Sequence, residues 1–409
     1  MQSEMCPSTF TGMSARRDRS DARRKVLIAG GGVAGLETMI ALDALASDRV
    51  EVELLSPEAT FHYRPLDVRE PFGLGRAERL DLSRLTAGRR ASHRRGALAA
   101  VDAEARRVET DAGERLSYDA LVVAAGARPR PALEGALTFW GASDVRALRD
   151  LLDELVRGAA GDVAFVLPGQ ATWPLPLYEL ALMTARHLAE RNRLRTSLTL
   201  VTHESAPLEL FGRSASEAIA TLLQRDGVAL RLGSYATAFA DGTLHLAPRG
   251  ELAAERVVAL PRLEVPEIPG LPQDAHGFVP TDLYGRVEGT QDVYAAGDVT
   301  TFPIKQGGLA AQQADVVAAS IAAWAGASVT SEPFRPVLRG QLLTGGAPRY
   351  LRSDLAGGRG DVSDVDVQPL WWPPGKVAGK YLAPLVAELG IGDAAPAEHP
   401  GAVDVLVEL

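Results

Sequence analysis

The segment at residues 26–37, VLIAGGGVAGLE, constrains the fold of this chain more than any other stretch. An apolar run typical of a β-strand leads into Gly-x-Gly-x-x-Gly, and a helical pattern follows. In such a unit the first glycine permits a tight turn, the second lets a phosphate approach the backbone, and the third lets helix and strand pack closely. A pyrophosphate would then lie at the helix N-terminus, where free N–H groups favour negative charge. The predicted cradle comprises Gly30, Gly32, Val33, Ala34 and Gly35.

A glycine-rich loop without a ligand is the alternative interpretation of these glycines. The strand before them and the helix after them argue against it, because isolated glycine clusters lack that context. The composition permits a fold of more than one such unit. A chain of 409 residues is too long for one hydrophobic core, so we expect two or three domains.

The composition also narrows the class of protein. Hydrophobic residues make up 46% of the chain and charged residues 23%, as in ordinary soluble globular proteins. The net charge of −9 argues against nucleic acid as a partner. No apolar signal segment follows Arg16-Arg17, and the apolar stretch 316–327 is too short to span a bilayer. We therefore predict a cytoplasmic protein.

Cys6 is the only cysteine of the chain. One thiol cannot form an intramolecular disulfide, a cysteine-based metal site or a CxxC redox pair. We therefore expect a reducing compartment and predict no metal site. The polar residues 1–24 that contain Cys6 carry no structural pattern, and we predict that they form a disordered tail.

The second predicted strand, at residues 50–55, ends at Ser56 and Pro57. A dinucleotide-binding βαβ unit usually carries Asp or Glu at this point to bind ribose hydroxyls, but a serine can form the same hydrogen bond. We therefore include both residues in the predicted binding site. An aromatic and basic cluster follows at 61–65. Its Arg64 either flanks a cofactor or serves loop packing, and both interpretations stay open.

Residues 96–126 predict a short antiparallel excursion and a return strand. Short strands at 98–101 and 107–110 lead to the apolar run 118–127, which is typical of a buried parallel strand. The small residues Ala125 and Gly126 at its end would let a ligand approach the backbone.

Three motifs in order carry a resemblance to a known family: the glycine motif, the strand ending in Ala124-Ala125-Gly126, and VYAAGDV at 293–299. Together they resemble the FAD-binding domain of the pyridine nucleotide-disulfide oxidoreductase superfamily, over roughly residues 25–325. The resemblance implies FAD as cofactor. It also implies that Gly297-Asp298 binds the ribityl chain or pyrophosphate and that Leu98 lies beside the adenine.

Alternating patterns in residues 158–274 predict a second doubly wound sheet, which the resemblance identifies as a nicotinamide-nucleotide domain. Its first turn carries Thr172, Pro174 and Leu177 where the family has its phosphate-loop glycines. Pro174 and Pro176 also lack the N–H donors that a pyrophosphate would need. These departures argue against NAD(P)H binding. We expect strands at 163–167, 198–202 and 228–232, and helices at 177–189 and 214–224.

The turn that leads to Pro-x-Tyr-Glu-x-Ala, with Ser56 after the earlier strand, resembles sulfide:quinone oxidoreductases and type II NADH dehydrogenases. The sulfide enzymes carry a redox cysteine in this turn, where this chain has Trp173. Without a thiolate no persulfide can form, so sulfide oxidation by that mechanism is excluded. Trp173 would instead stack near the flavin or close a substrate pocket, and Tyr178 could orient a substrate.

Glu179 is the candidate for proton transfer, because burial at a domain interface would raise its pKa towards use as an acid or base. A structural carboxylate at the start of a helix, favoured there by the helix dipole, is the alternative for Glu179.

In the related quinone reductases a lysine and a Gln-rich helix point at the flavin pyrimidine ring, and Lys305, Gln306 and Gln312-Gln313 match that pattern. Gly308 replaces the first Gln of the quinone motif. A solvated loop lysine is the alternative for Lys305.

The C-terminal residues predict a hairpin from 337–343 and 350–351, an acidic flexible loop at 356–366, and a helix at 376–389 interrupted by Pro384. Trp371 and Trp372 beside an apolar helix face could sit in a membrane interface. More often such a stripe covers the protein's own core or a homodimer partner, and we favour that interpretation.

The predicted fold is α/β, with two Rossmann-like doubly wound domains and a small C-terminal α+β region. We place a discontinuous FAD-binding domain at 25–157 and 275–335, the second Rossmann-like domain at 158–274, and the C-terminal region at 336–409. The predicted function is a cysteine-independent, FAD-dependent oxidoreductase acting on a quinone or small organic substrate. An NAD(P)H dehydrogenase of the NADH:quinone type and a non-catalytic FAD-binding protein are the alternatives.

Overall fold

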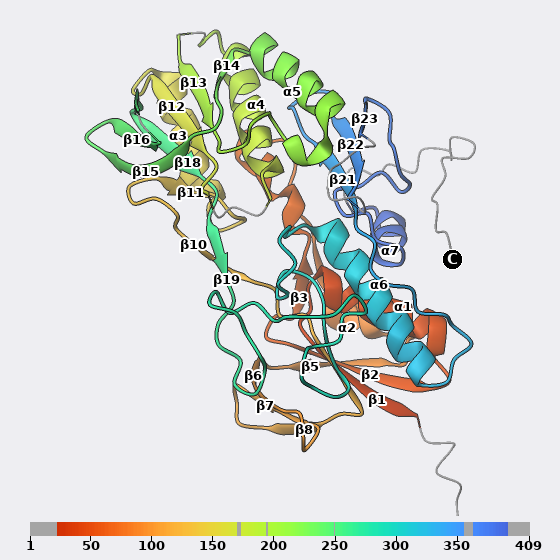
Figure 1. Cartoon of the computed structure of the whole chain (residues 1–409). Coiled ribbons are helices and arrows are strands. Elements are labelled where there is room, and N and C mark those ends of the chain that lie inside the picture. The colour runs from red at the N-terminus through yellow and green to blue at the C-terminus, as the bar shows by residue number, and fades with distance from the viewer. Residues whose placement is uncertain (1–22, 170–172, 194, 249, 356–362, 392–409) are drawn as a thin grey trace, which may run out of the picture.

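The structure is a computed structural model that describes residues 23–169, 173–193, 195–248, 250–355 and 363–391. Of the predicted tail, residues 1–22 lie outside the described residues, and β1 begins at Arg24. Two parallel sheets with flanking helices form the body of the molecule, as the sequence predicted (Figure 1).

The first sheet has five parallel strands in the order β20-β9-β1-β2-β5. Their bounds are β1 Arg24–Ala29, β2 Val50–Ser56, β5 Ala91–Arg95, β9 Ala120–Val123 and β20 Val293–Ala295. The order reverses beside β1, so the crevice at the carboxyl ends of the central strands is a topological switch point.

Alternate residues of β1 serve two cores, because successive strand side chains point to opposite faces. Val26 and Ile28 pack on the side of helices α1 (Val33–Ala46) and α6 (Gly307–Trp324), which run side by side in Figure 1. Leu27 packs on the other side with the meander formed by β6 (Leu98–Asp102), β7 (Arg107–Thr110) and β8 (Arg115–Ser117).

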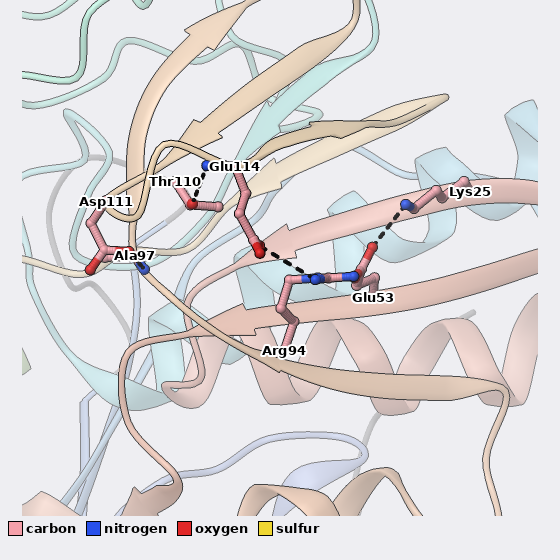
Figure 2. A network of polar contacts seen from close by, with 7 residues as sticks. All are labelled: Lys25, Glu53, Arg94, Ala97, Thr110, Asp111 and Glu114. Atoms are coloured by element: carbon pink, nitrogen blue, oxygen red, sulfur yellow. Dashed lines mark hydrogen bonds and ion pairs between the residues drawn. The ribbon is translucent and has the colours of Figure 1, made fainter.

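An ion-pair network crosses this sheet (Figure 2). Lys25 Nζ lies 2.8 Å from Glu53 Oε2, and Glu53 Oε1 accepts a hydrogen bond from Arg94 Nε. Arg94 also reaches Glu114, in the turn between β7 and β8, at 3.4 Å. Burial acts to raise the pKa of the Glu53 carboxyl, but the hydrogen bonds and charges of Lys25 and Arg94 hold it below its ordinary value. The network ties β1, β2, β5 and the meander together.

The second sheet is also parallel, in the order β11-β18-β12-β13-β14. Its bounds are β11 Leu137–Thr138, β12 Asp162–Val166, β13 Ser197–Val201, β14 Val228–Arg231 and β18 Arg256–Ala259, with helices α3 Val145–Arg157, α4 Leu175–Ala189 and α5 Arg213–Arg225. An antiparallel meander extends from it, formed by β15 Tyr235–Ala240, β16 Thr243–Ala247 and β17 Glu251–Ala253. The pair β10 (Arg128–Arg130) and β19 (Arg262–Glu264) connects the two sheets (Figure 1).

Short elements complete the first unit. They are β3 Thr60–His62, β4 Arg79–Asp81, the 3₁₀ helix η2 Arg64–Phe72 and α2 Leu82–Thr86, while η3 Glu209–Phe211 precedes α5. Within the described part of the chain, no helix combines the length and hydropathy needed to cross a bilayer.

The C-terminal sheet has three strands, β21 Val337–Leu342, β22 Arg349–Asp354 and β23 Ser363–Asp366. The predicted hairpin is confirmed, but β23 occupies the end of the stretch expected to be a loop. The predicted helix 376–389 is wrong at its start, because α7 spans only Leu382–Glu388. Residues 376–381 are held instead by hydrogen bonds to other parts of the chain. Pro384 is the third residue of α7, where no intrahelical N–H bond is required.

The C-terminal region packs on both Rossmann-like units. Leu338, Leu342 and Leu351 belong to the core of the second sheet and α4. Val377 and Leu382 belong to the core shared by α1 and α6. Val377 of the apolar stripe is therefore part of the protein's own core, whereas Leu389 at the end of the stripe is exposed.

Candidate functional site

The sequence-predicted cradle residues meet at the carboxyl edge of the first sheet. A Cβ atom placed on Gly30 would lie 2.1 Å from the Ala124 carbonyl oxygen. A Cβ atom on Gly297 would lie 3.0 Å from the Ala34 Cβ, and one on Gly31 would lie 2.8 Å from Ser56 Oγ. The ends of β1, β2, β9 and β20 therefore converge around one crevice, as parallel strands of this order require.

The glycines of the cradle have different physical roles. Gly30 has φ +132°, and a Cβ on Gly35 would lie 1.8 Å from the Gly30 carbonyl oxygen, so neither site accepts a side chain. Gly32 is exposed, and among the described residues nothing lies within 4 Å of its ideal Cβ. Helix α1 begins just after Gly32 and has no side-chain cap in the described structure. Its first N–H groups therefore face open space suited to a phosphate.

The other predicted residues at this edge of the sheet differ in exposure. Pro57 and Ala125 are exposed, Gly126 is half-buried, and Leu98 packs partly against the core beneath the sheet. Asp298 lies 3.7 Å from the Arg64 guanidinium, which lies 4.1 Å from the Trp140 ring centroid. Arg64 therefore pairs with the predicted cofactor-binding acid, which favours the first of its two interpretations.

Lys305 is buried, so it is not a solvated loop lysine. Its Nζ donates to the Thr300 carbonyl and lies 3.9 Å from the Phe278 ring centroid. Burial lowers the pKa of Lys305 to about 8, against the opposing charges of Asp298 and Asp274. A lysine of this kind changes its charge close to neutral pH.

The glutamines after Lys305 bind the backbone. Gln306 Oε1 caps α6 by accepting from Leu309 N at 2.8 Å, and Nε2 donates to Arg339 O at 3.0 Å. Gln312 exchanges two hydrogen bonds with the backbone of Val337, and Gln313 Oε1 accepts from Gly297 N at 2.7 Å. These glutamines fix α6 against β21 and the cradle.

Glu179 lies in the second turn of α4 and is fully buried. One oxygen, Oε1, accepts from Leu343 N at 2.7 Å and also from Lys376 Nζ. The ion pair spans 197 residues of sequence, and Lys376 is itself buried. The sequence pattern placed Lys376 only at the start of the predicted helix 376–389. No local pattern distinguishes it, because its partner comes from another domain-sized unit.

Comparison with known proteins identifies the family. Residues 24–320 match the family model described as pyridine nucleotide-disulphide oxidoreductase, which is well over half of the chain. The chain belongs to this family. It is therefore a flavin-dependent oxidoreductase. A relative named NADH dehydrogenase-like protein, from Mycobacterium tuberculosis, is 28% identical over 67% of this chain and 72% of its own.

Solved structures of the family share the fold. The sulfide:quinone oxidoreductase of Aquifex aeolicus superposes with a TM-score of 0.76 at 20% identity, covering 84% of this chain and 87% of that one. The NDH2 of Plasmodium falciparum, solved with NADH, gives 0.56 at 17% identity, covering 68% and 65%. The predicted resemblance and fold class are thus confirmed.

Trp173 and Tyr178, which the sequence placed near the flavin and substrate, pack against residues of the second unit. Trp173 packs on Phe211, with ring centroids 5.9 Å apart. The Tyr178 ring is fully buried, and its hydroxyl donates to Glu204 Oε2 at 2.6 Å. The Tyr178 ring therefore contacts the protein interior in this structure, and its role in orienting a substrate stays a prediction.

In the second sheet, side chains of the protein itself lie against the end of β12. The ring of Tyr235 lies against Gly169, where an ideal Cβ would be 2.7 Å away, and stacks on His203 at 5.3 Å. Glu204, at the end of β13, turns inward to Tyr178 and Thr202. Of the predicted turn, residues 170–172 lie outside the described structure. The described part lacks the open glycine backbone and outward acid that bind a dinucleotide.

Proposed function

We propose that this protein is a FAD-dependent oxidoreductase that works without a redox cysteine and reduces or oxidises a quinone or a small organic substrate. The carrying observation is the crevice in which four strand ends meet and Gly32 faces open space. A pyrophosphate would lie at the α1 N-terminus beside Gly32, with Ser56 and Asp298 as polar partners for the sugar and ribityl hydroxyls. Bound FAD would supply reversible two-electron chemistry.

The Glu179–Lys376 pair is the proposed proton-handling group. Both side chains are buried, and Val377, the next residue, packs against Gly307 at the N-terminus of α6. Two-electron reduction of a quinone to the quinol takes up two protons. Lys376 Nζ, held by Glu179, can relay them in turn by releasing one proton and regaining another from solvent. Lys305, with a pKa of about 8, places a second cation near Asp298.

The proposed electron donor is not a nicotinamide nucleotide, because Tyr235 covers Gly169 and Glu204 points away from the crevice. The relative named NADH dehydrogenase-like favours the other candidate, an NADH:quinone dehydrogenase. Both candidates use the same cradle and the same ion pair. They differ only in what reduces the flavin.

Anaerobic absorbance spectroscopy tests these candidates. We expect a yellow protein whose flavin is not bleached by NADH, NADPH or sulfide but equilibrates with a quinol and reoxidises with the quinone. Fast bleaching by NADH would select the NADH dehydrogenase, and bleaching by sulfide would refute the argument from Trp173. A colourless protein that cannot be reconstituted with FAD would refute the proposal.

Cysteine independence has its own test. Cys6→Ser should leave the rate of quinone turnover within about twofold of wild type, since no second thiol is available for a redox pair. A loss of turnover would contradict cysteine independence.

We also propose a cytoplasmic location and no nucleic-acid partner. The buried Trp371, packed on Tyr350 at 5.2 Å, supports a core role for the C-terminal stripe over membrane contact. A homodimer through this region stays a prediction.

A further inference from the structure

Glu37 is a fully buried carboxylate in the second turn of α1, two residues after the last cradle glycine. A buried carboxylate is unfavourable unless hydrogen bonds or charges compensate it. Its two oxygens accept from the backbone N–H groups of Tyr381 and Leu382, each at 2.7 Å. These residues lie more than 340 positions away, at the start of α7. Glu37 therefore anchors the C-terminal segment to the cradle helix.

Asp315 of α6 completes this anchor. Its carboxyl forms a hydrogen bond with Glu37 across the contact between α1 and α6. Burial raises the pKa of both carboxyls, and the charge of Glu37 raises that of Asp315 further, against the attraction of Lys380. Because Glu37 already accepts two amide hydrogens, the shared proton belongs on Asp315, which donates it to Glu37. One proton thus lets two carboxyls share a buried site.

The anchor and the ion pair are close along the chain. Gly379 lies against Glu37, since a Cβ there would be 2.7 Å from Glu37 Oε2. Only two residues separate Gly379 from Lys376. Between them Val377 N donates to the Tyr63 hydroxyl at 3.0 Å. The chain has little slack over so short a span, because each residue extends at most about 3.6 Å.

We propose that Glu37 is a positioning residue which, with Asp315, anchors residues 379–382 and thereby holds the Lys376 ammonium against Glu179. The catalytic consequence rests on the proposed function. The anchoring itself does not, because it concerns the order of the segment and can be measured without turnover.

Amide hydrogen exchange of the purified full chain tests the anchoring. We expect Glu37→Gln to speed exchange in peptides covering 376–388 at least tenfold, because an amide side chain offers one acceptor oxygen where the carboxylate offers two. Gly379→Ala should also speed exchange at 376–388, because its methyl group would displace the segment from Glu37. This variant keeps the test valid if Glu37→Gln fails to fold. Asp315→Asn keeps a donor to Glu37 and should retain slow exchange. Unchanged exchange in both Glu37→Gln and Gly379→Ala would overturn the proposal.

A double-mutant cycle tests the link to Lys376. Glu37→Gln should lower quinone turnover about tenfold or more, because small misplacements of a catalytic group are costly. In a Lys376→Met background the same change should have less than a twofold effect. Equal losses in both backgrounds would show a merely structural role. Glu53→Gln is the matched control, since Glu53 is another buried carboxylate of this unit whose partners are Lys25 and Arg94 (Figure 2). It should leave turnover and exchange at 376–388 unchanged.

If the wild type turns over no quinone, the proposed function fails while the exchange measurement still decides the anchoring.

Discussion

Single residues of the cradle differ in whether they serve the fold or the ligand. Gly30 and Gly35 are required because a Cβ there would overlap protein backbone, whereas a Cβ at Gly32 would lie within 4 Å of no other described residue. The spacing Gly-x-Gly-x-x-Gly does not distinguish these roles, because all three positions look alike in sequence. Only the positions of the neighbouring backbone atoms separate them.

This difference predicts opposite outcomes for two alanine variants. Gly30→Ala should lower the melting temperature of the apoprotein and abolish FAD binding, because its Cβ would overlap the Ala124 carbonyl. Gly32→Ala should fold like wild type yet bind FAD at least about tenfold more weakly, because the methyl group would occupy phosphate space. Differential scanning fluorimetry and flavin fluorescence titration measure the two effects. Normal FAD affinity in Gly32→Ala would contradict the cradle assignment.

Glu204 makes stability depend on pH. Burial raises the pKa of Glu204 to about 7, although Tyr178 and Thr202 donate hydrogen bonds to it, and its Oε1 has no partner among the described residues. The folded protein therefore holds a proton that the unfolded chain has released between pH 4.5 and 7. The free energy of unfolding should fall as pH rises through this window, by roughly 3 kcal/mol from this group.

Glu204→Gln removes that titration. Relative to wild type, its free energy of unfolding should rise between pH 4.5 and 8 by roughly 3 kcal/mol, because the variant carries no charge to bury. Urea unfolding at a series of pH values measures the difference between the two proteins, in which other titrating groups cancel. A difference that stays constant with pH would disprove the assignment.

Among the elements, α6 follows its sequence prediction in position but differs in the role of its glutamines. The sequence resemblance pointed the start of this Gln-rich helix at the flavin, with Gly308 in place of the first Gln of the quinone motif. In the structure the Gln312 side-chain amide donates to Val337 O and accepts from Val337 N at the start of β21, as a neighbouring strand would. The helix thus carries the C-terminal sheet on one face and contacts the cradle through Gln313. A periodicity analysis cannot assign these faces, because β21 is distant in sequence.

Gln312→Ala should therefore reduce stability and leave quinone affinity intact. We expect a loss of about 1–3 kcal/mol in the free energy of unfolding, because two backbone groups of Val337 lose their partners. Gln224→Ala, at an exposed position of α5, is the matched control and should change stability by less than about 0.5 kcal/mol. Steady-state kinetics would contradict this prediction if the KM for quinone rose several-fold without a loss of stability.

At the scale of the whole molecule, the C-terminal region joins the two Rossmann-like units. Leu338 and Leu351 enter one core, Val377 and Leu382 enter the other, and the Glu179–Lys376 pair lies between them. Removing one partner of a buried ion pair leaves an uncompensated charge, whereas removing both does not.

Lys376→Met should therefore lower the free energy of unfolding by about 3 kcal/mol or more, through the buried Glu179 carboxylate. Glu179→Gln/Lys376→Met should recover at least half of that loss of stability and keep the reduced turnover of Lys376→Met. Urea unfolding of the wild type and both variants provides the measurement. A double variant as unstable as the single one would contradict the ion pair as the source of the effect.

The sequence by itself determined the family, both parallel sheets, the first cradle and the absence of a redox thiol pair. These properties depend on residue type and on short spacing, which local patterns encode. It placed the start of the C-terminal helix wrongly and did not reveal that the Tyr178 ring is fully buried. Tertiary structure decided the partners of buried charges, Lys376 for Glu179 and residues 381–382 for Glu37, and it placed Tyr235 over Gly169. Such contacts join segments up to hundreds of residues apart. Only the packed fold brings them within hydrogen-bonding distance, so no local periodicity could have revealed them.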